Sequence, residues 1–217
     1  DFTTVTSGTS AIKMNGPRDV AFDSAGNLWA AEVGNNRVLE FLAPLSTGMA
    51  AGLVTGQPDF ITGSSGSGAG KLNQPTGIAF DSLGGLWVAD NGNNRVLKFT
   101  ALPFGFSTAA GAIGQPDLTT ITSGSGTTKL FGASDVAFDT AGNLLVTDGN
   151  NHRVLKFLAP LTFGMAASTV IGQPDFTTVT SGSGTSKMNH SIYLALDTAG
   201  NLLVADNTNN RVLKFLA

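Results

Sequence analysis

The sequence repeats with a period of 58 residues, and this constrains the fold more than any other feature. The period is strict, so each loop in one repeat has the same length as its counterpart in the next. A fixed period of this size indicates a propeller, a solenoid or another repeat array. The segment NNRVLEF and its near-copies begin at Asn35, Asn93, Asn151 and Asn209.

The repeats span residues 1–58, 59–116, 117–174 and 175–217, which we interpret as a single domain or a segment of one. The fourth repeat lacks the residues that correspond to 44–58 in the first. That segment contains a predicted strand, so we expect the last repeat to lack its outer strand. We also expect the chain to belong to a longer array or to an assembly.

Composition narrows the class of protein. Hydrophobic residues make up 41% of the 217 residues, which is enough to form a core. A net charge of −3, with only 12% charged residues, gives no basic face for nucleic acid. No apolar run is long enough to predict a membrane span. The absence of cysteine excludes disulfides and thiolate metal sites.

The second repeat shows the expected strands most clearly. Short apolar runs occur at 76–80, 86–90 and 95–99, and they are separated by turn sequences rich in Asp, Asn and Gly. A weaker run lies near 111–115 and is closed by a proline. Four antiparallel strands joined by short hairpins are typical of a propeller blade.

The segment PTGIAFDSLGGLWVADNGNNRVLKF (75–99) resembles the NHL repeat. The segment IGQPDFTT (171–178) is similar to one that recurs in long bacterial NHL-repeat proteins. This resemblance extends over the whole chain and implies an all-β propeller of four-stranded antiparallel blades. NHL propellers usually have six blades, whereas this chain has four repeats. The functions implied by the family are varied: exported binding modules, RNA-binding heads and a few lyases.

Each arginine of the repeated segment follows an acidic residue by five positions. The two side chains can pair across a tight turn, and Arg–carboxylate bonds suit such a task. A feature present in every repeat predicts a framework role, and the paired asparagines are predicted to bond their own main chain. The predicted structural turn pairs are Glu32 and Arg37, Asp90 and Arg95, Asp148 and Arg153, and Asp206 and Arg211.

The repeats differ most at the start of their first strand. In propellers these strand ends surround the central channel, which is a usual location for ligands. Two interpretations stay open: a binding site, or sequence drift at a solvent-exposed mouth. The candidate ligand-binding residues are Arg18, Asp19, Gln74, Thr76, Ser134, Asp135, His190 and Tyr193.

Support for catalysis is weak in the sequence. His152 replaces a turn asparagine, which leaves His190 and Tyr193 as an acid/base pair without a third group to orient it. The DSAGN and DTAGN turns lack the further carboxylates that calcium requires. We therefore expect no catalytic residue, no metal and no cofactor.

We expect a non-catalytic scaffold or protein-interaction propeller, extracellular or on a bacterial cell surface, where low charge and Gly/Ser/Thr-rich loops are suitable. The expected partner is a protein or a second copy, because the last strand of the fourth repeat has an unpaired edge. The N-terminal FTTVTS (2–7) is predicted to cover part of this edge. The alternative is a small-molecule-binding, sugar-binding or lyase-type propeller that uses the central channel.

Overall fold

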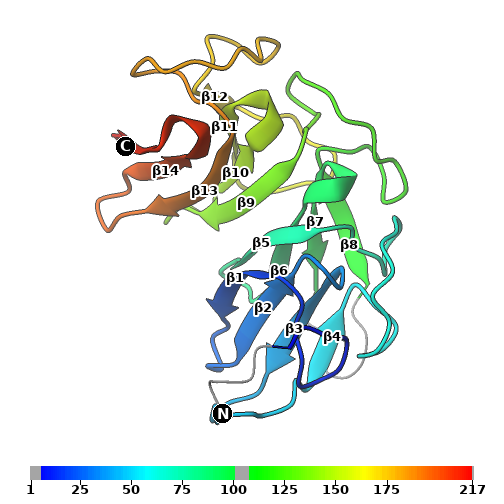
Figure 1. Cartoon of the computed structure of the whole chain (residues 1–217). Coiled ribbons are helices and arrows are strands. Elements are labelled where there is room, and N and C mark those ends of the chain that lie inside the picture. The colour runs from blue at the N-terminus through cyan, green and yellow to red at the C-terminus, as the bar shows by residue number, and fades with distance from the viewer. Residues whose placement is uncertain (1–5, 101–107, 217) are drawn as a thin grey trace.

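The computed structural model describes residues 6–100 and 108–216, which form four antiparallel sheets (Figure 1). Three sheets have four strands and the last has three. The first strand of each sheet contacts the first strand of the next, and the sheets follow one another as blades around a common axis (Figure 1). The chain is therefore all-β, with four propeller blades, and its last blade lacks the outer strand.

The strands follow the chain in simple order within each blade. Blade 1 contains β1 (Pro17–Phe22), β2 (Leu28–Glu32), β3 (Arg37–Phe41) and β4 (Leu53–Thr55). Blade 2 contains β5 (Pro75–Phe80), β6 (Leu86–Asp90), β7 (Arg95–Phe99) and β8 (Ala109–Ile113). Blade 3 contains β9 (Ala133–Phe138), β10 (Leu144–Asp148), β11 (Arg153–Phe157) and β12 (Thr169–Ile171). Blade 4 contains β13 (Ser191–Leu196), β14 (Leu202–Asp206) and β15 (Arg211–Phe215).

The strands of blade 2 agree with those predicted from its sequence. The hairpin from β6 to β7 passes through a 3-10 turn, η1 (Asn91–Asn93), and the equivalent turns are η2 (Gly149–Asn151) and η3 (Asn207–Asn209). All five residues of β6 are buried, because this strand is covered by a neighbouring blade on each face. In the described part of the chain, no helix has the length and apolar character needed to cross a membrane.

Each first strand has an irregular register at the end nearest the channel. In blade 1 the pairing with β2 shifts between Pro17 and Asp19, and in blade 4 the pairing with β14 shifts between Ser191 and Tyr193. Similar shifts occur in the other two blades. Such bulges turn side chains away from the regular alternation of a strand. They therefore decide which residues face the channel.

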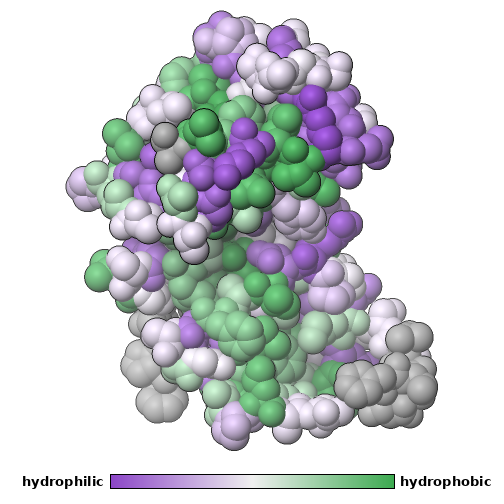
Figure 2. All heavy atoms as spheres, turned by 90° about the vertical axis from the view of Figure 1, so that its left-hand side faces the viewer, coloured by the Kyte–Doolittle hydropathy of each residue, from purple (hydrophilic) through white to green (hydrophobic). Residues whose placement is uncertain are grey.

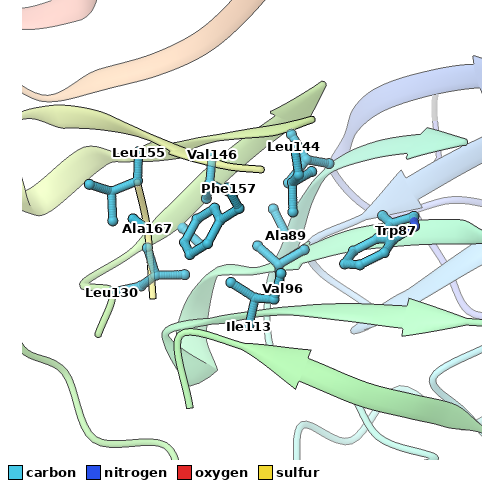
Figure 3. Packing of buried hydrophobic residues seen from close by; sticks show 12 residues of the cluster. Trp87, Ala89, Val96, Ile113, Leu130, Leu144, Val146, Leu155, Phe157 and Ala167 are labelled. Atoms are coloured by element: carbon cyan, nitrogen blue, oxygen red, sulfur yellow. The ribbon is translucent and has the colours of Figure 1, made fainter. Parts of the chain in front are cut away.

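The core is a series of interfaces between blades. At the interface of blades 2 and 3, Trp87, Val96 and Ile113 pack against the facing side chains of blade 3 (Figure 3). The indole of Trp87 also meets Phe138 edge to face, with ring centroids 5.7 Å apart. The buried residues of blade 3 in this cluster are Leu130, Ala133, Val136, Leu144, Val146, Leu155, Phe157 and Ala167. Blades 2 and 3 therefore bury each of their faces against a neighbouring blade.

The repeated arginine joins its blade to the connection of the following repeat. Arg95 Nε donates to Asp90 Oδ2 at 2.7 Å, and both side chains are fully buried. Its Nη1 donates to the carbonyl oxygen of Leu118, which lies in the next repeat. Its Nη2 donates to the carbonyl oxygens of Gly68 and Lys71 at 3.3 and 3.2 Å. Arg37 and Arg153 make equivalent bonds, so this arginine is part of the frame.

The Gly-Gln-Pro-Asp segment has a similar structural task. Gln115 Nε2 donates to the carbonyl oxygen of Asn94 in the turn of its own blade, at 2.9 Å. It also donates to the carbonyl oxygen of Thr122 in the following link, at 2.9 Å. Gln57 and Gln173 make the same kind of bridge. The glutamine therefore holds the link between blades against the hairpin turn.

The side chain of the second asparagine in the turn bonds to the main chain of the next repeat. The prediction that this side chain bonds the main chain of its own turn is therefore wrong. Asn94 has a left-handed backbone, with φ of 55°. Its Oδ1 accepts the N–H of Gly132, and its Nδ2 donates to the carbonyl oxygen of Ile121, each at 2.9 Å. In blade 3 the equivalent His152 accepts the N–H of His190 at 2.9 Å. The left-handed residue therefore links one blade to the next.

Candidate ligand site at the inner ends of the blades

A cavity of about 200 Å³ lies at the inner ends of the four blades. Six of the eight candidate ligand-binding residues line it, and every blade contributes at least one. They are Arg18, Gln74, Thr76, Ser134, His190 and Tyr193. The remaining lining residues are Val33, Asn91, Asn150 and Ile192.

The other two candidates, Asp19 and Asp135, bond to the main chain of neighbouring strands. Asp19 Oδ2 accepts the N–H of Ile78 in blade 2 at 2.8 Å. Asp135 Oδ2 accepts the N–H of Leu194 in blade 4 at 2.9 Å. The other oxygen of each carboxylate accepts the N–H of the following residue. The geometry gives both carboxylates a framework role, because each satisfies an N–H group at an irregular point of the next inner strand.

Burial changes the charge of these two carboxylates. The pKa of Asp135 is raised to about 7, mainly by desolvation and also by the nearby charge of Asp19, while the N–H groups of Leu194 and Val136 oppose the shift. Desolvation also raises the pKa of Asp19. Asp135 is therefore only partly ionised at neutral pH, and the surroundings of the cavity are less acidic than two carboxylates would suggest.

Two residues of the cavity have an unusual backbone. Gln74 and His190 have φ of 51° and 53°, in the left-handed region. Their equivalents, Gly16 and Gly132, also have positive φ. A left-handed backbone disfavours side chains other than glycine by roughly 1–2 kcal/mol. Glycine occupies this position in the first and third repeats, whereas the second and fourth have Gln74 and His190. This pattern was the signal for a left-handed position, and sequence reasoning missed it.

His190 lies between the cavity and blade 3. Its main-chain N–H donates to Nδ1 of His152. Burial and the nearby His190 lower the pKa of His152, which favours the neutral ring needed to accept this bond. Within the described residues, Nδ1 of His190 itself is buried and has no hydrogen-bond partner. The ring of His190 is therefore incompletely satisfied by the described residues.

Tyr193 connects the two ends of the blade series at the channel. Its hydroxyl donates to the carbonyl oxygen of Arg18 at 3.5 Å, a long bond between blade 4 and blade 1. The hydroxyl of Ser134 donates to the carbonyl oxygen of Gly132 at 3.0 Å. Among the described residues, neither hydroxyl is bonded to a histidine or a carboxylate, so neither is a nucleophile activated by a base.

The cavity lining is polar with little net charge. Among the described residues that line it, Arg18 is the one fixed cation and there is no carboxylate, and amides and hydroxyls supply most of the remaining polar groups. No group of three or more His, Cys, Asp or Glu side chains that could hold a metal lies among residues 6–100 and 108–216. This arrangement suits recognition of a small polar molecule by hydrogen bonds.

Comparison with known proteins identifies the repeats. The NHL repeat profile matches residues 72–99 and 132–157, which contain the first three strands of blades 2 and 3. The chain therefore contains NHL repeats at these two positions. It is 30% identical over 96 residues to NHL repeat-containing protein 3 of Mus musculus, an alignment that covers 42% of this chain and 26% of the relative. The alignment therefore spans about a quarter of that relative's length.

Solved propellers share the fold of this NHL-repeat chain. The periplasmic gluconolactonase of Pseudomonas aeruginosa matches 98% of the chain with a TM-score of 0.62 and 16% identity, over 54% of its own length. An auxiliary nutrient binding protein of Bacteroides ovatus matches 94% with a TM-score of 0.61 and 12% identity, over 49% of its length. At such low identity the likeness shows the fold alone, and the chain spans about half of these larger proteins.

Proposed function

We propose that this chain is a non-catalytic interaction propeller that assembles end to end with a second copy of itself through its two outermost blade faces. The observation that carries the proposal is that each of these faces presents an exposed valine, Val212 on blade 4 and Val20 on blade 1, although equivalent residues in the interior of the chain are buried. Other apolar residues of the blade 1 face, such as Phe41, are already buried within the chain. The proposal commits to a second copy because this chain already pairs the same two kinds of face at each of its three internal junctions.

The outer face of blade 4 presents an exposed valine. Val212 is 65% exposed, whereas its equivalents Val38, Val96 and Val154 are fully buried against the following blade. Arg211 in the same strand retains its bond to Asp206 at 2.7 Å, but its side chain is 29% exposed. This face therefore has the chemistry of a blade interface without a covering blade.

The outer face of blade 1 is its counterpart. Val20 is 58% exposed, whereas its equivalents Ile78 and Val136 are 4% and 3% exposed. An apolar groove of about 290 Å³ lies on this blade. Figure 2 shows apolar side chains in green on both the upper and lower parts of the open side of the molecule. The groove is lined by Ile12, Met14, Leu28, Phe41, Leu45, Ser46, Gly48 and Met49.

The internal junctions show how the two faces fit. Val96 of blade 2 belongs to the same buried cluster as Leu144 and Phe157 of blade 3. The equivalent residues of blade 1 are Leu28 and Phe41, so Val212 of one copy would lie over these two residues of the next. Such a head-to-tail contact is heterologous, and it gives a ring if the rotation closes and a filament if it does not.

Two further features bear on this proposal. The N-terminal segment predicted to cover the blade edge lies mostly in residues 1–5, outside the described residues, whereas the nearby Ser10 carbonyl accepts from Arg37 of blade 1 itself.

The low charge and the Gly/Ser/Thr-rich links support an extracellular or cell-surface location, which fractionation of the source cells would test. Partner proteins other than a second copy are outcomes of the assembly test.

The second candidate function is the enzymatic or small-molecule alternative. One structural relative is a gluconolactonase and another is a nutrient binding protein, and both share the propeller fold. In the part of the chain that the structure describes, the cavity hydroxyls of Ser134 and Tyr193 are bonded to carbonyl oxygens rather than to a base, which favours binding over catalysis.

Sedimentation velocity over a range of concentrations tests the assembly. We expect the unmodified chain to form species larger than the monomer as its concentration rises. Val212→Lys should abolish this association, because it places a charge in the apolar contact. Leu83→Lys is the matched control, since Leu83 is 88% exposed on a blade 2 turn away from both free faces. A strictly monomeric chain, or association unaffected by Val212→Lys, would contradict the proposal.

A further inference from the structure

We propose that the cavity at the inner ends of the blades binds a neutral, polyhydroxylated molecule of monosaccharide size. This inference does not depend on assembly through the outer blade faces, because all four blades of one chain line the cavity. It assigns a ligand class to a site that the assembly proposal leaves unused.

The first support is backbone strain at two residues that line the cavity. Gln74 and His190 occupy left-handed positions where two other blades have glycine. Glycine would satisfy the backbone at all four positions without strain. Residues with strained backbone conformations cluster at active sites and ligand-binding sites. Gln74 precedes the first strand of blade 2 and His190 precedes the first strand of blade 4, and both residues line the same cavity.

The second support is a set of polar groups without protein partners. Nδ1 of His190 is buried and unpartnered within residues 6–100 and 108–216. The side chains of Arg18, Gln74 and Asn150 also line the cavity. In the portion of the chain that the structure describes, none of these three forms a hydrogen bond to protein. Groups of this kind supply both donors and acceptors, which is the requirement for binding adjacent hydroxyl groups.

The remaining walls favour an uncharged ring over an anion. Ile192 and Val33 add apolar surface, and Tyr193 adds an aromatic ring next to the polar groups. Arg18 is the fixed cation of the lining, but Asp19 and Asp135 bond to main chain close by. The neighbouring carboxylate of Asp19 offsets part of the charge of Arg18, which reduces the advantage of a phosphate or sulfate. A volume of about 200 Å³ fits one sugar ring rather than an oligosaccharide.

Isothermal titration calorimetry with glucose, galactose, mannose and myo-inositol tests the ligand class, and gluconate serves as the charged comparison. We expect saturable binding of at least one neutral compound, with one site per chain. Binding of gluconate alone would overturn the neutral class. The absence of saturable binding for every neutral compound would overturn the proposal.

A glycine variant separates binding from folding. His190→Gly restores the residue that blades 1 and 3 have, and it should weaken binding by roughly tenfold through loss of one buried hydrogen-bonding ring. Its melting temperature should not fall, because the left-handed backbone is relieved. Asn210→Gly is the matched control, since Asn210 has φ of 52° and does not line the cavity. Unchanged affinity in His190→Gly, or equal loss in Asn210→Gly, would overturn the site.

Discussion

The carboxylate of Asp135 lies against Gly77 of the preceding blade, with Oδ1 only 2.3 Å from the point where a β-carbon on residue 77 would stand. The main-chain α-carbon of Asp135 is also within 2.6 Å of that point. The inner strands of blades 2 and 3 therefore approach so closely that any side chain at position 77 requires movement of backbone.

Gly77→Ala should destabilise the chain for this reason. We expect a loss of about 2–4 kcal/mol in the free energy of unfolding, in the range of overpacked and strained sites. Gly70→Ala is the control, because a β-carbon there meets nothing within 4 Å. Urea denaturation of both variants measures the difference, and equal stability of the two would show that the inner strands separate easily.

The buried arginines should contribute far more stability than the exposed one. Arg153→Met leaves Asp148 buried without its cation, and removing one partner of a buried pair destabilises proteins by roughly 3–5 kcal/mol. Arg211→Met removes the equivalent bond from a partly exposed side chain, and we expect a loss of about 1 kcal/mol. Thermal and urea unfolding of the two variants at low protein concentration tests this ranking. Similar losses would mean that burial does not control the contribution.

Asp135 should make stability depend on pH. The pKa of Asp135 is about 7 in the folded chain, and its ordinary value, which we take for the unfolded chain, is 3.8. Between these two pH values the folded chain therefore holds a proton that the unfolded chain releases. The stabilising contribution is therefore fully present below about pH 4 and is lost as the pH rises to about 7. Asp135→Asn removes this titration while retaining an acceptor. The difference in unfolding free energy between the two proteins should change by a few kcal/mol over that window, and parallel pH profiles would contradict the shift.

The junction of blades 3 and 4 has buried hydroxyl groups at two positions where the junction of blades 2 and 3 has alanine. Thr147 and Ser191 are fully buried, and their hydroxyl oxygens have no hydrogen-bond partner among the described residues. Their equivalents at the junction of blades 2 and 3 are Ala89 and Ala133, which belong to an apolar cluster. The double variant Thr147→Ala, Ser191→Ala should gain about 1 kcal/mol, because burial of unpaired hydroxyls is unfavourable. Calorimetric melting measures this gain, and a clear loss would indicate that the hydroxyls bind water or a ligand.

The repeat period was sufficient to predict the number of blades and the missing strand. The alternation and turn residues of 75–99 also located three strands of blade 2, since these depend on neighbours in the sequence. The ion pair of Asp90 and Arg95 could be predicted for the same reason, because both residues flank one tight hairpin. Local structure was therefore accessible from local pattern.

Contacts between repeats could not be predicted in this way. The sequence pattern predicts a ligand site that contains both Asp135 and Arg18, whereas the carboxylate of Asp135 accepts the N–H of Leu194, 59 residues along the chain. The bond between Asn94 and Gly132 likewise crosses from one repeat to the next. The periodic pattern does not show that Arg18 lines the channel whereas Asp135 bonds to a neighbouring strand. The bulges at the inner strand ends decide this, and they arise only when the blades pack.

The bond from Arg95 to the carbonyl of Leu118 places part of each blade's support in the following repeat. A single 58-residue repeat, wherever its ends are placed, would therefore lose bonds to the repeats before and after it. We expect that such an isolated repeat does not fold. In-frame duplication of 58 residues has the opposite property, because every new junction repeats bonds that the chain already makes. Unequal recombination could thus lengthen or shorten this protein by whole blades during evolution without requiring a new kind of interface.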